Sequence, residues 1–305
     1  MQYRQLGAGG PTIPTLMFGA WPIGGGMGAV DEEQAIQTIR HALDLGVTAI
    51  DTAEGYRSSE TIVGKAVSGR RDEVFLATKV TRGPYNHTRL QEAIANSLRA
   101  LQTDHVDLYQ LHSYPQGVSL EEAMEALVEV KESGKARYVG VSNFTVDQLS
   151  AATRLYPVQS LQPRLNIFDS EPVRDLLPNC EREGIGVIVH SPLAKGLLTG
   201  KYRPGHVFAT DDERSRFPRF QGDLFAQYTA LADELAEIAR SRGGISLVQL
   251  GIAWTLHQTG VTSCIVGAKS PEQVSEQVSA ASLSLSVAEL ERIDAIAARA
   301  LTAAG

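Results

Sequence analysis

Short apolar runs alternate with amphipathic stretches along most of this chain, and no other feature restricts the fold as strongly. An intervening stretch such as Asp31–Leu45 carries apolar residues at helical spacing, with Asp31 as the predicted N-cap. Each apolar run is short and apolar on both faces, as a buried parallel strand requires. The predicted strands are Leu16–Gly19, Val47–Asp51, Val74–Lys79, Val106–His112, Tyr138–Ser142, Ser160–Pro163, Gly186–Ser191 and Thr262–Val266. Eight such units in one chain predict an α/β fold, the (β/α)8 or TIM barrel.

Three segments extend beyond this repeat. Tyr3–Leu6 and Thr12–Pro14, joined by a glycine-containing turn, predict an N-terminal β-hairpin. Lys195–Leu224 is a long charged loop, and a loop of that length is usually a lid or a binding loop. A further helix is predicted around Val287–Ala298. Because no linker rich in Pro, Ser or Gly divides the chain, we expect residues 1–305 to form a single domain.

Composition excludes several classes of protein. The 305 residues are 43% hydrophobic, enough for a large core, and the formal net charge is −7 with the basic residues scattered. Nucleic acids and anionic membranes attract clustered cations, so neither is an expected partner. Cys180 and Cys264 lie far apart and the seven histidines form no HxxxH pair, so we expect neither a disulfide scaffold nor a metal site. The N-terminus has no apolar signal region and no run of 18 apolar residues occurs, which predicts a soluble, cytoplasmic protein.

Three of the predicted strands end in a polar residue that can move protons. Asp51, Lys79 and His112 follow one another at intervals of 28 and 33 residues, about one strand–helix–strand unit each. Parallel barrel strands deliver their last residues to one rim, where this fold keeps its chemistry. Tyr56 lies five residues beyond Asp51 on the loop that leaves the same strand. The sequence therefore predicts a cluster of four acid–base residues.

Charge explains what this cluster could do. A tyrosine phenol has a pKa near 10 and is a weak acid at neutral pH. An ammonium about 4 Å away is worth roughly 4 kcal/mol at an effective dielectric constant near 20, so Lys79 is expected to lower the pKa of Tyr56. Asp51 would hold Lys79 charged, and His112 would exchange a hydrogen bond with the phenol. The alternative is a structural ion pair between Asp51 and Lys79 beside a core histidine.

Eight longer sequence motifs contain these four residues or lie elsewhere along the chain. They are FGAWPIGG, DTAEGYRSSETIVGKA, LATKV, DLYQLHSYP, GKARYVGVSNF, LQPRLN, HSPLAKGLLTGKY and IVGAKSPEQVSEQ. Through them the sequence resembles the aldo-keto reductase superfamily over almost its whole length. The resemblance implies that Asp51, Tyr56, Lys79 and His112 form a catalytic tetrad and that the cofactor is NADPH (NADP+). It also implies a small-molecule aldehyde or ketone as substrate, reduced to an alcohol by hydride transfer with Tyr56 as general acid.

The same resemblance assigns residues to the cofactor. Its nicotinamide carboxamide would meet Ser142, Asn143 and Gln162, whose side chains offer donors and acceptors. His190 stands where many members place an aromatic residue that stacks on the nicotinamide. Lys269 would pair with the 2′-phosphate, although a lysine near a helix start is more often a solvated surface residue. The remaining assignments are Ala20, Trp21 and Asp51 near the reaction centre, Ser191, Pro192, Leu193, Lys195, Lys201 and Arg214 along the phosphates, and Gly267, Gln273, Glu276 and Gln277 at the adenosine end.

The substrate pocket is predicted between the strand ends and the lid, Lys201–Leu224. Its expected walls are Trp21, Tyr56, Arg57, His112 and Tyr114. Arg57 replaces a glycine common in the family and would either attract anionic substrates or pair outward with Glu60. A loose GxGxxG/A match, Gly24, Gly26 and Ala29, lacks the strand–turn–helix context of a dinucleotide fingerprint and is interpreted as a glycine-rich substrate loop.

Two other functions remain open at this point. One is a nucleotide-binding regulatory protein on the same barrel, resembling the potassium-channel β subunits, a branch that departs from the tetrad at the histidine present here as His112. The other is a lyase or aldolase with Lys79 as a Schiff base, which leaves the nucleotide-type strings unexplained. The sequence does not indicate an oligomeric state.

Overall fold

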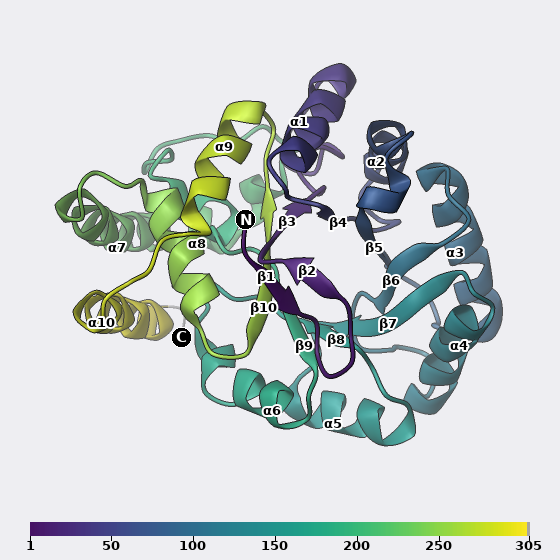
Figure 1. Cartoon of the computed structure of the whole chain (residues 1–305). Coiled ribbons are helices and arrows are strands. Elements are labelled where there is room, and N and C mark those ends of the chain that lie inside the picture. Colours follow the sequence, from purple (N-terminus) through teal and green to yellow (C-terminus); the bar gives the residue numbers. More distant parts are fainter. Residues whose placement is uncertain (304–305) are drawn as a thin grey trace.

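A closed barrel of eight parallel strands forms the centre of the molecule (Figure 1). The computed structural model describes residues 1–303. The strands are β3 (Leu16–Gly19), β4 (Ala49–Asp51), β5 (Phe75–Val80), β6 (Val106–Leu111), β7 (Ala136–Ser142), β8 (Ser160–Gln162), β9 (Gly186–Val189) and β10 (Val261–Gly267), with β10 pairing back onto β3. The predicted (β/α)8 barrel is confirmed, with strand bounds that differ from the predicted ones by at most two residues.

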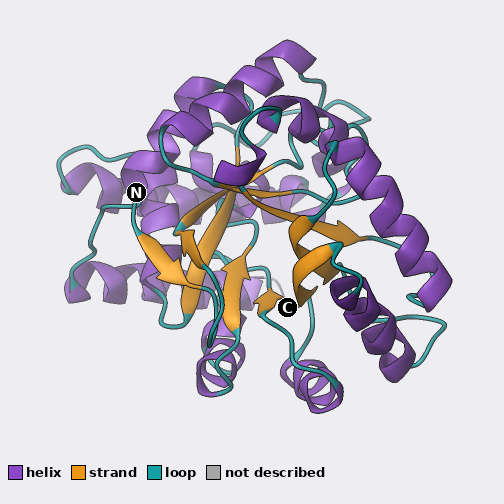
Figure 2. Ribbon diagram, turned by 45° about the vertical axis from the view of Figure 1, so that its right-hand side comes forward, coloured by secondary structure: helices purple, strands orange, loops and turns teal. Residues whose placement is uncertain are grey.

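Helices surround the strands on the outside, as Figure 2 shows in a turned view. They are α1 (Glu32–Asp44), α2 (Ser59–Val67), α3 (His87–Leu101), α4 (Leu120–Glu132), α5 (Val146–Leu155), α6 (Leu176–Arg182), α8 (Leu247–His257) and α9 (Pro271–Ala280). The N-cap predicted for α1 is present, since Asp31 Oδ1 accepts from the backbone N–H of Gln34 at 2.9 Å. The apolar faces of these helices cover the outer face of the barrel and form the main core.

Two helices lie outside the repeat. The predicted C-terminal helix is α10 (Val287–Ala303), and it packs against α7 (Gly222–Ser241), a helix that was not predicted to lie outside the repeat. Figure 1 shows this pair beside each other at one edge of the barrel. The phenol of Tyr228 donates to the carbonyl of Ala300 at 3.4 Å and joins them.

The N-terminal hairpin closes one end of the barrel. Its strands are β1 (Tyr3–Gln5) and β2 (Thr12–Pro14), and Leu6 and Ile13 pack into the interior against residues such as Met17 and Ile188. Gly7 has φ +67°, and a Cβ there would lie 2.7 Å from the backbone nitrogen of Gly186, so only glycine allows this approach. The end at which the strands finish therefore remains available for a site.

The long loop predicted after β9 is folded on itself. It contains the 3₁₀ turns η3 (Ala194–Thr199), η4 (Glu213–Arg216) and η5 (Pro218–Phe220). Within the lid, the guanidinium of Arg214 lies 4.8 Å from the ring centre of Tyr202 and 4.6 Å from that of Phe208. Arg214 also pairs with Asp212 through Nε at 2.9 Å and through a terminal nitrogen at 2.6 Å. The lid thus has a small core of its own.

Candidate active site

A cavity of about 790 Å³ opens at the C-terminal ends of the strands. Asp51, Tyr56 and His112 line it, whereas Lys79 lies behind them with no exposed surface. Most residues assigned to the cofactor also line it: Ala20, Trp21, Asp51, Asn143, Gln162, His190, Ser191, Pro192, Leu193, Lys195, Lys201, Arg214, Gly267, Lys269, Gln273, Glu276 and Gln277. Ser142 is buried beneath the cavity wall. The barrel therefore brings strand ends far apart in sequence to one cavity.

The four predicted acid–base residues form one connected group. Lys79 Nζ lies 2.5 Å from Asp51 Oδ1 and donates to the carbonyl of Thr52 at 2.8 Å. The same ammonium lies 3.5 Å from the phenolic oxygen of Tyr56. On the other side of that oxygen, His112 Nε2 lies at 3.4 Å. The Tyr56 hydroxyl is thus placed between a buried cation and an imidazole.

Burial changes the expected electrostatics of the phenol. Removal from water raises the pKa of Tyr56 above its usual value, and this outweighs the charge of Lys79, which lowers it. The expected lowering of the Tyr56 pKa is therefore wrong. Burial opposes the charge on Lys79, but Asp51 and Tyr56 outweigh it and raise the pKa of the ammonium. Burial and the charge of Lys79 lower the pKa of His112 to about 3, so this imidazole is neutral at pH 7.

Side-chain amides line the wall next to this group. Gln162 Nε2 donates to Asp51 Oδ2 at 2.9 Å and lies 3.3 Å from Oε1 of Gln110. These bonds use its amide nitrogen, and among residues 1–303 its amide oxygen forms no hydrogen bond, while the residue lines the cavity. Asn143 Nδ2 donates to the carbonyl of His112 at 3.0 Å. Gln110 was not predicted as a site residue, because its position inside an apolar strand gave no signal.

Each ring nitrogen of His190 contacts a neighbouring side chain. Its Nε2 lies 2.9 Å from Asn143 Oδ1, and its Nδ1 lies 2.9 Å from the hydroxyl of Ser191. Burial lowers its pKa to about 3, so the ring is neutral and carries one proton. Since the amide oxygen of Asn143 can only accept, that proton belongs on Nε2. Asn143 and Ser191 have φ +59° and +60°, and such left-handed backbone is often found at functional sites.

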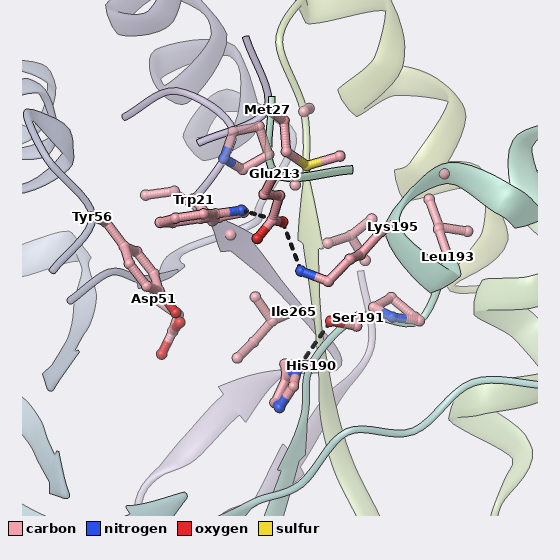
Figure 3. A pocket seen from close by; sticks show the side chains of 18 of the residues that line it. Trp21, Met27, Asp51, Tyr56, His190, Ser191, Leu193, Lys195, Glu213 and Ile265 are labelled. Carbon is pink, nitrogen blue, oxygen red and sulfur yellow. Dashed lines mark hydrogen bonds and ion pairs between the residues drawn. The ribbon is translucent and has the colours of Figure 1, made fainter. Parts of the chain in front are cut away.

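A carboxylate from the lid crosses the cavity. Glu213 Oε1 accepts from the indole Nε1 of Trp21 at 2.9 Å and from Lys195 Nζ at 2.6 Å (Figure 3). Trp21 in turn packs against the ring of Tyr56, with ring centres 4.8 Å apart. Glu213 was not predicted, and an acidic residue in a charged loop carries no signal that would have identified it. It ties the lid to two other walls.

The residues assigned to the adenosine end lie around the start of α9. Lys269 Nζ donates to the carbonyls of Met27 and Gly28, the latter at 3.3 Å, and its backbone N–H donates to Gln273 Oε1 at 2.8 Å. The glycine-rich loop thus reaches Lys269 at one end. At the other, a Cβ on Gly24 would lie 2.1 Å from the carbonyl oxygen of Tyr56. The glycine-rich loop was predicted to contact the substrate, but it also reaches the residues assigned to the adenosine end of the cofactor.

Residues 15–298 match the sequence model of the aldo/keto reductase family. The chain belongs to this family. It is 38% identical to the aldo-keto reductase YhdN of Bacillus subtilis, over 90% of this chain and 87% of that protein. The structure resembles a glycerol dehydrogenase from Gluconobacter oxydans with a TM-score of 0.87, 32% identity and coverage of 98% and 95% of the two chains. It also resembles an aldo/keto reductase from Klebsiella pneumoniae, solved in complex with NADP and acetate, with a TM-score of 0.78, 30% identity and coverage of 97% and 95%.

Two residues that were expected to line the substrate pocket do not line the cavity of this aldo-keto reductase. Arg57 donates to the carbonyl of Gly25 at 2.6 Å and is not among the lining residues. It does not pair with Glu60 either, because that carboxyl is buried and accepts from the hydroxyl of Thr78 at 2.6 Å. Tyr114 packs on Phe144 outside the cavity, with ring centres 5.2 Å apart. Arg57 thus lies outside the cavity wall, as the outward alternative predicts, but its partner is the carbonyl of Gly25 and not Glu60.

Other lining residues of this aldo-keto reductase were not predicted. Among them are Arg82 after β5, Arg164 after β8, and Tyr202 and Glu213 in the lid. Arg214, expected near the phosphates, donates hydrogen bonds to Asp212 and, at 2.8 Å, to the phenol of Tyr202.

Within residues 1–303, no three His, Cys, Asp or Glu side chains are grouped so as to hold a metal ion. In the same part of the chain, no helix is both long and apolar enough to cross a membrane.

Proposed function

We propose that this member of the family reduces an aldehyde or ketone to an alcohol with NADPH and that Tyr56 supplies the proton. The observation that carries the proposal is the position of the Tyr56 hydroxyl at the cavity surface, 3.5 Å from Lys79 Nζ and 3.4 Å from His112 Nε2. A general acid must lie within hydrogen-bond reach of the atom that it protonates, and the surface position allows this. In the reverse direction the same group would accept the proton of an alcohol.

Each member of the tetrad has a distinct part in this proposal. Tyr56 donates its proton to the carbonyl oxygen as negative charge develops there, and Lys79 stabilises the phenolate that remains. Asp51 keeps Lys79 charged and oriented through the 2.5 Å contact. Neutral His112 carries one N–H. Its Nδ1 lies 3.2 Å from the hydroxyl of Thr81, so Nε2 can donate to the substrate oxygen when Nδ1 accepts from Thr81.

The cavity fits a large, anionic dinucleotide. Its volume lies within the range of about 300–1,000 Å³ that is usual for ligand pockets. The side-chain oxygen of Gln162 suits a carboxamide N–H, and Lys195, Lys201 and Lys269 are cations in the wall of the same cavity. When bound, the nicotinamide supplies the hydride. We propose that the side chains assigned from the sequence, including Ser142 beneath the wall, bind or orient the cofactor.

The structure argues against the lyase alternative. Lys79 has no exposed surface and its ammonium is in contact with Asp51, Thr52 and Tyr56, whereas a Schiff-base lysine must be neutral and accessible. The regulatory alternative leaves the Tyr56–His112 contact without a purpose.

One experiment separates the three functions. The purified protein is mixed with NADPH and a panel of aldehydes and ketones, and loss of NADPH absorbance is followed. We expect turnover with some carbonyl compounds. Binding of NADPH without turnover would favour the regulatory protein, and covalent labelling of Lys79 by borohydride with a small ketone would favour the lyase.

A further inference from the structure

The cavity wall contains more cationic side chains than those assigned to the cofactor. Six Lys and Arg side chains line it, against three carboxylates. The carboxylate of Asp51 is neutralised by Lys79 and that of Glu213 by Lys195. Arg214 is neutralised by Asp212, and Lys269 is held by two backbone carbonyls. Apart from Lys201, which lies over the ring of Tyr202, the cations left over are Arg82 and Arg164.

Arg82 lies beside the reaction centre. It follows β5 directly after Thr81, whose hydroxyl is 3.2 Å from His112 Nδ1. Its side chain is exposed, and within residues 1–303 it forms no ion pair and no hydrogen bond. A guanidinium that lines a cavity without a carboxylate partner is available to an anion in that cavity.

Arg164 occupies the opposite side of the same stretch of rim. It follows Gln162 and Pro163 after β8, is exposed, and likewise has no ion pair in the described part of the chain. The strands β6 and β7, which lead to His112 and Asn143, lie between β5 and β8 in the barrel. Arg164 also lines a side recess of about 240 Å³ that it shares with Lys195, Phe217 and Arg219. The two arginines therefore flank the rim on which a carbonyl group would lie.

We propose that Arg82 and Arg164 are specificity-determining residues that select carbonyl substrates carrying a second, anionic group, a carboxylate or a phosphate ester. This inference rests on the proposed reduction of carbonyl compounds and adds the class of substrate. The anion binds to the guanidinium forks at the rim, while the carbonyl oxygen lies at Tyr56. Anions of both kinds accept two parallel N–H bonds from arginine, so the structure defines their shared chemistry.

Neither arginine is among the residues assigned to the cofactor. The cations assigned to its phosphates are Lys195, Lys201, Arg214 and Lys269, which lie between β9 and α9 in the sequence. Arg164 shares a side recess with Lys195, whereas Arg82 adjoins His112 through Thr81. An unpaired arginine at that position has no anion to meet unless the substrate brings one.

Matched pairs of substrates test the inference. At saturating NADPH, kcat/KM is measured for para-carboxybenzaldehyde against its methyl ester, and for glycolaldehyde phosphate against glycolaldehyde. We expect the anionic member of at least one pair to be favoured, and the two pairs show whether carboxylate or phosphate is the better anion. Arg82→Gln and Arg164→Gln should each lower kcat/KM for that anion by about tenfold, mainly through KM, and leave its neutral partner within about twofold. Arg82→Lys should recover part of the loss, because the charge remains and the fork does not.

The controls separate this inference from the proposed function. Arg154→Gln removes an exposed arginine of α5 that does not line the cavity. It should leave the ratio of kcat/KM between the anionic and the neutral member unchanged in both substrate pairs. Two results would overturn the inference while leaving carbonyl reduction intact. One is an equal loss of kcat/KM for charged and neutral substrates in both variants. The other is a larger dissociation constant for NADPH without a higher KM for the anionic substrate. Absence of turnover with every carbonyl compound would instead overturn the proposed function.

Discussion

Lys79 Nζ and Asp51 Oδ1 lie 2.5 Å apart, with 0% and 4% of their side chains exposed. A buried ion pair of this kind tolerates the loss of both charges better than the loss of one. Among residues 1–303, Asp51 alone supplies a full negative charge in direct contact with this ammonium. The pair therefore links the stability of the barrel to the chemistry of Tyr56.

Asp51→Asn should destabilise the protein by about 3 kcal/mol, because it leaves Lys79 buried with only neutral acceptors. The free energy of unfolding is measured by urea titration at pH 7. The double variant Asp51→Leu, Lys79→Met is the control and should lose less than the single variant. A larger loss in the double variant would show that the pair is held by packing and not by charge.

Tyr56→Phe should retain NADPH binding and lower turnover by a factor on the order of 10² to 10⁴, since the ring remains and the proton donor does not. Quenching of protein fluorescence by NADPH measures binding, and single-turnover absorbance measures the chemical step. Turnover equal to that of the wild type would remove Tyr56 from the mechanism.

The two neutral histidines should make the protein less stable in mild acid. His112 and His190 have pKa values of about 3 when folded and near 6.5 when unfolded, so below pH 6.5 the unfolded chain binds more protons. Their contribution to stability is therefore present above pH 6.5 and is lost as the pH falls towards 3.

Urea titrations at several pH values between 6.5 and 4 give the slope of the unfolding free energy. His190→Asn should reduce this slope by up to one proton, whatever its effect on stability at pH 7. An unchanged slope would mean that His190 is not kept neutral by folding.

Lys269→Ala should weaken NADPH binding by roughly 1.5 kcal/mol and leave NADH nearly unchanged, because only NADPH has a 2′-phosphate to meet this ammonium. We expect the lower end of the range for a charged hydrogen bond, since Lys269 must first leave the carbonyls of Met27 and Gly28. Calorimetry with both nucleotides measures the difference. Equal losses for the two would show that another residue discriminates between them.

Arg57→Gly should change KM for charged and neutral carbonyl substrates in the same proportion, because Arg57 binds the Gly25 carbonyl outside the cavity wall. Its φ of +54° suits glycine, so the substitution should not strain the backbone. A selective rise in KM for the anionic substrate would place Arg57 in the pocket after all.

The sequence by itself determined the barrel and the convergence of its polar strand ends at one rim. Strand and helix periods are local properties, and eight of each permit few arrangements other than a closed barrel. Because the ends of parallel strands meet at one rim, the intervals between Asp51, Lys79 and His112 were enough to predict that these residues converge. Their separations of 2.5 to 3.5 Å along the chain of contacts agree with that prediction.

Only the tertiary structure decided the walls of the cavity and the balance of charge within it. Arg57 and Arg82 both follow strand ends by a few residues, yet one turns to the Gly25 carbonyl and the other lines the cavity. Loop conformation depends on contacts between distant segments, such as Glu213 with Trp21, which no local pattern records. Burial acts in the same way: it raises the pKa of Tyr56 although Lys79 alone would lower it, because desolvation depends on every atom packed around the phenol.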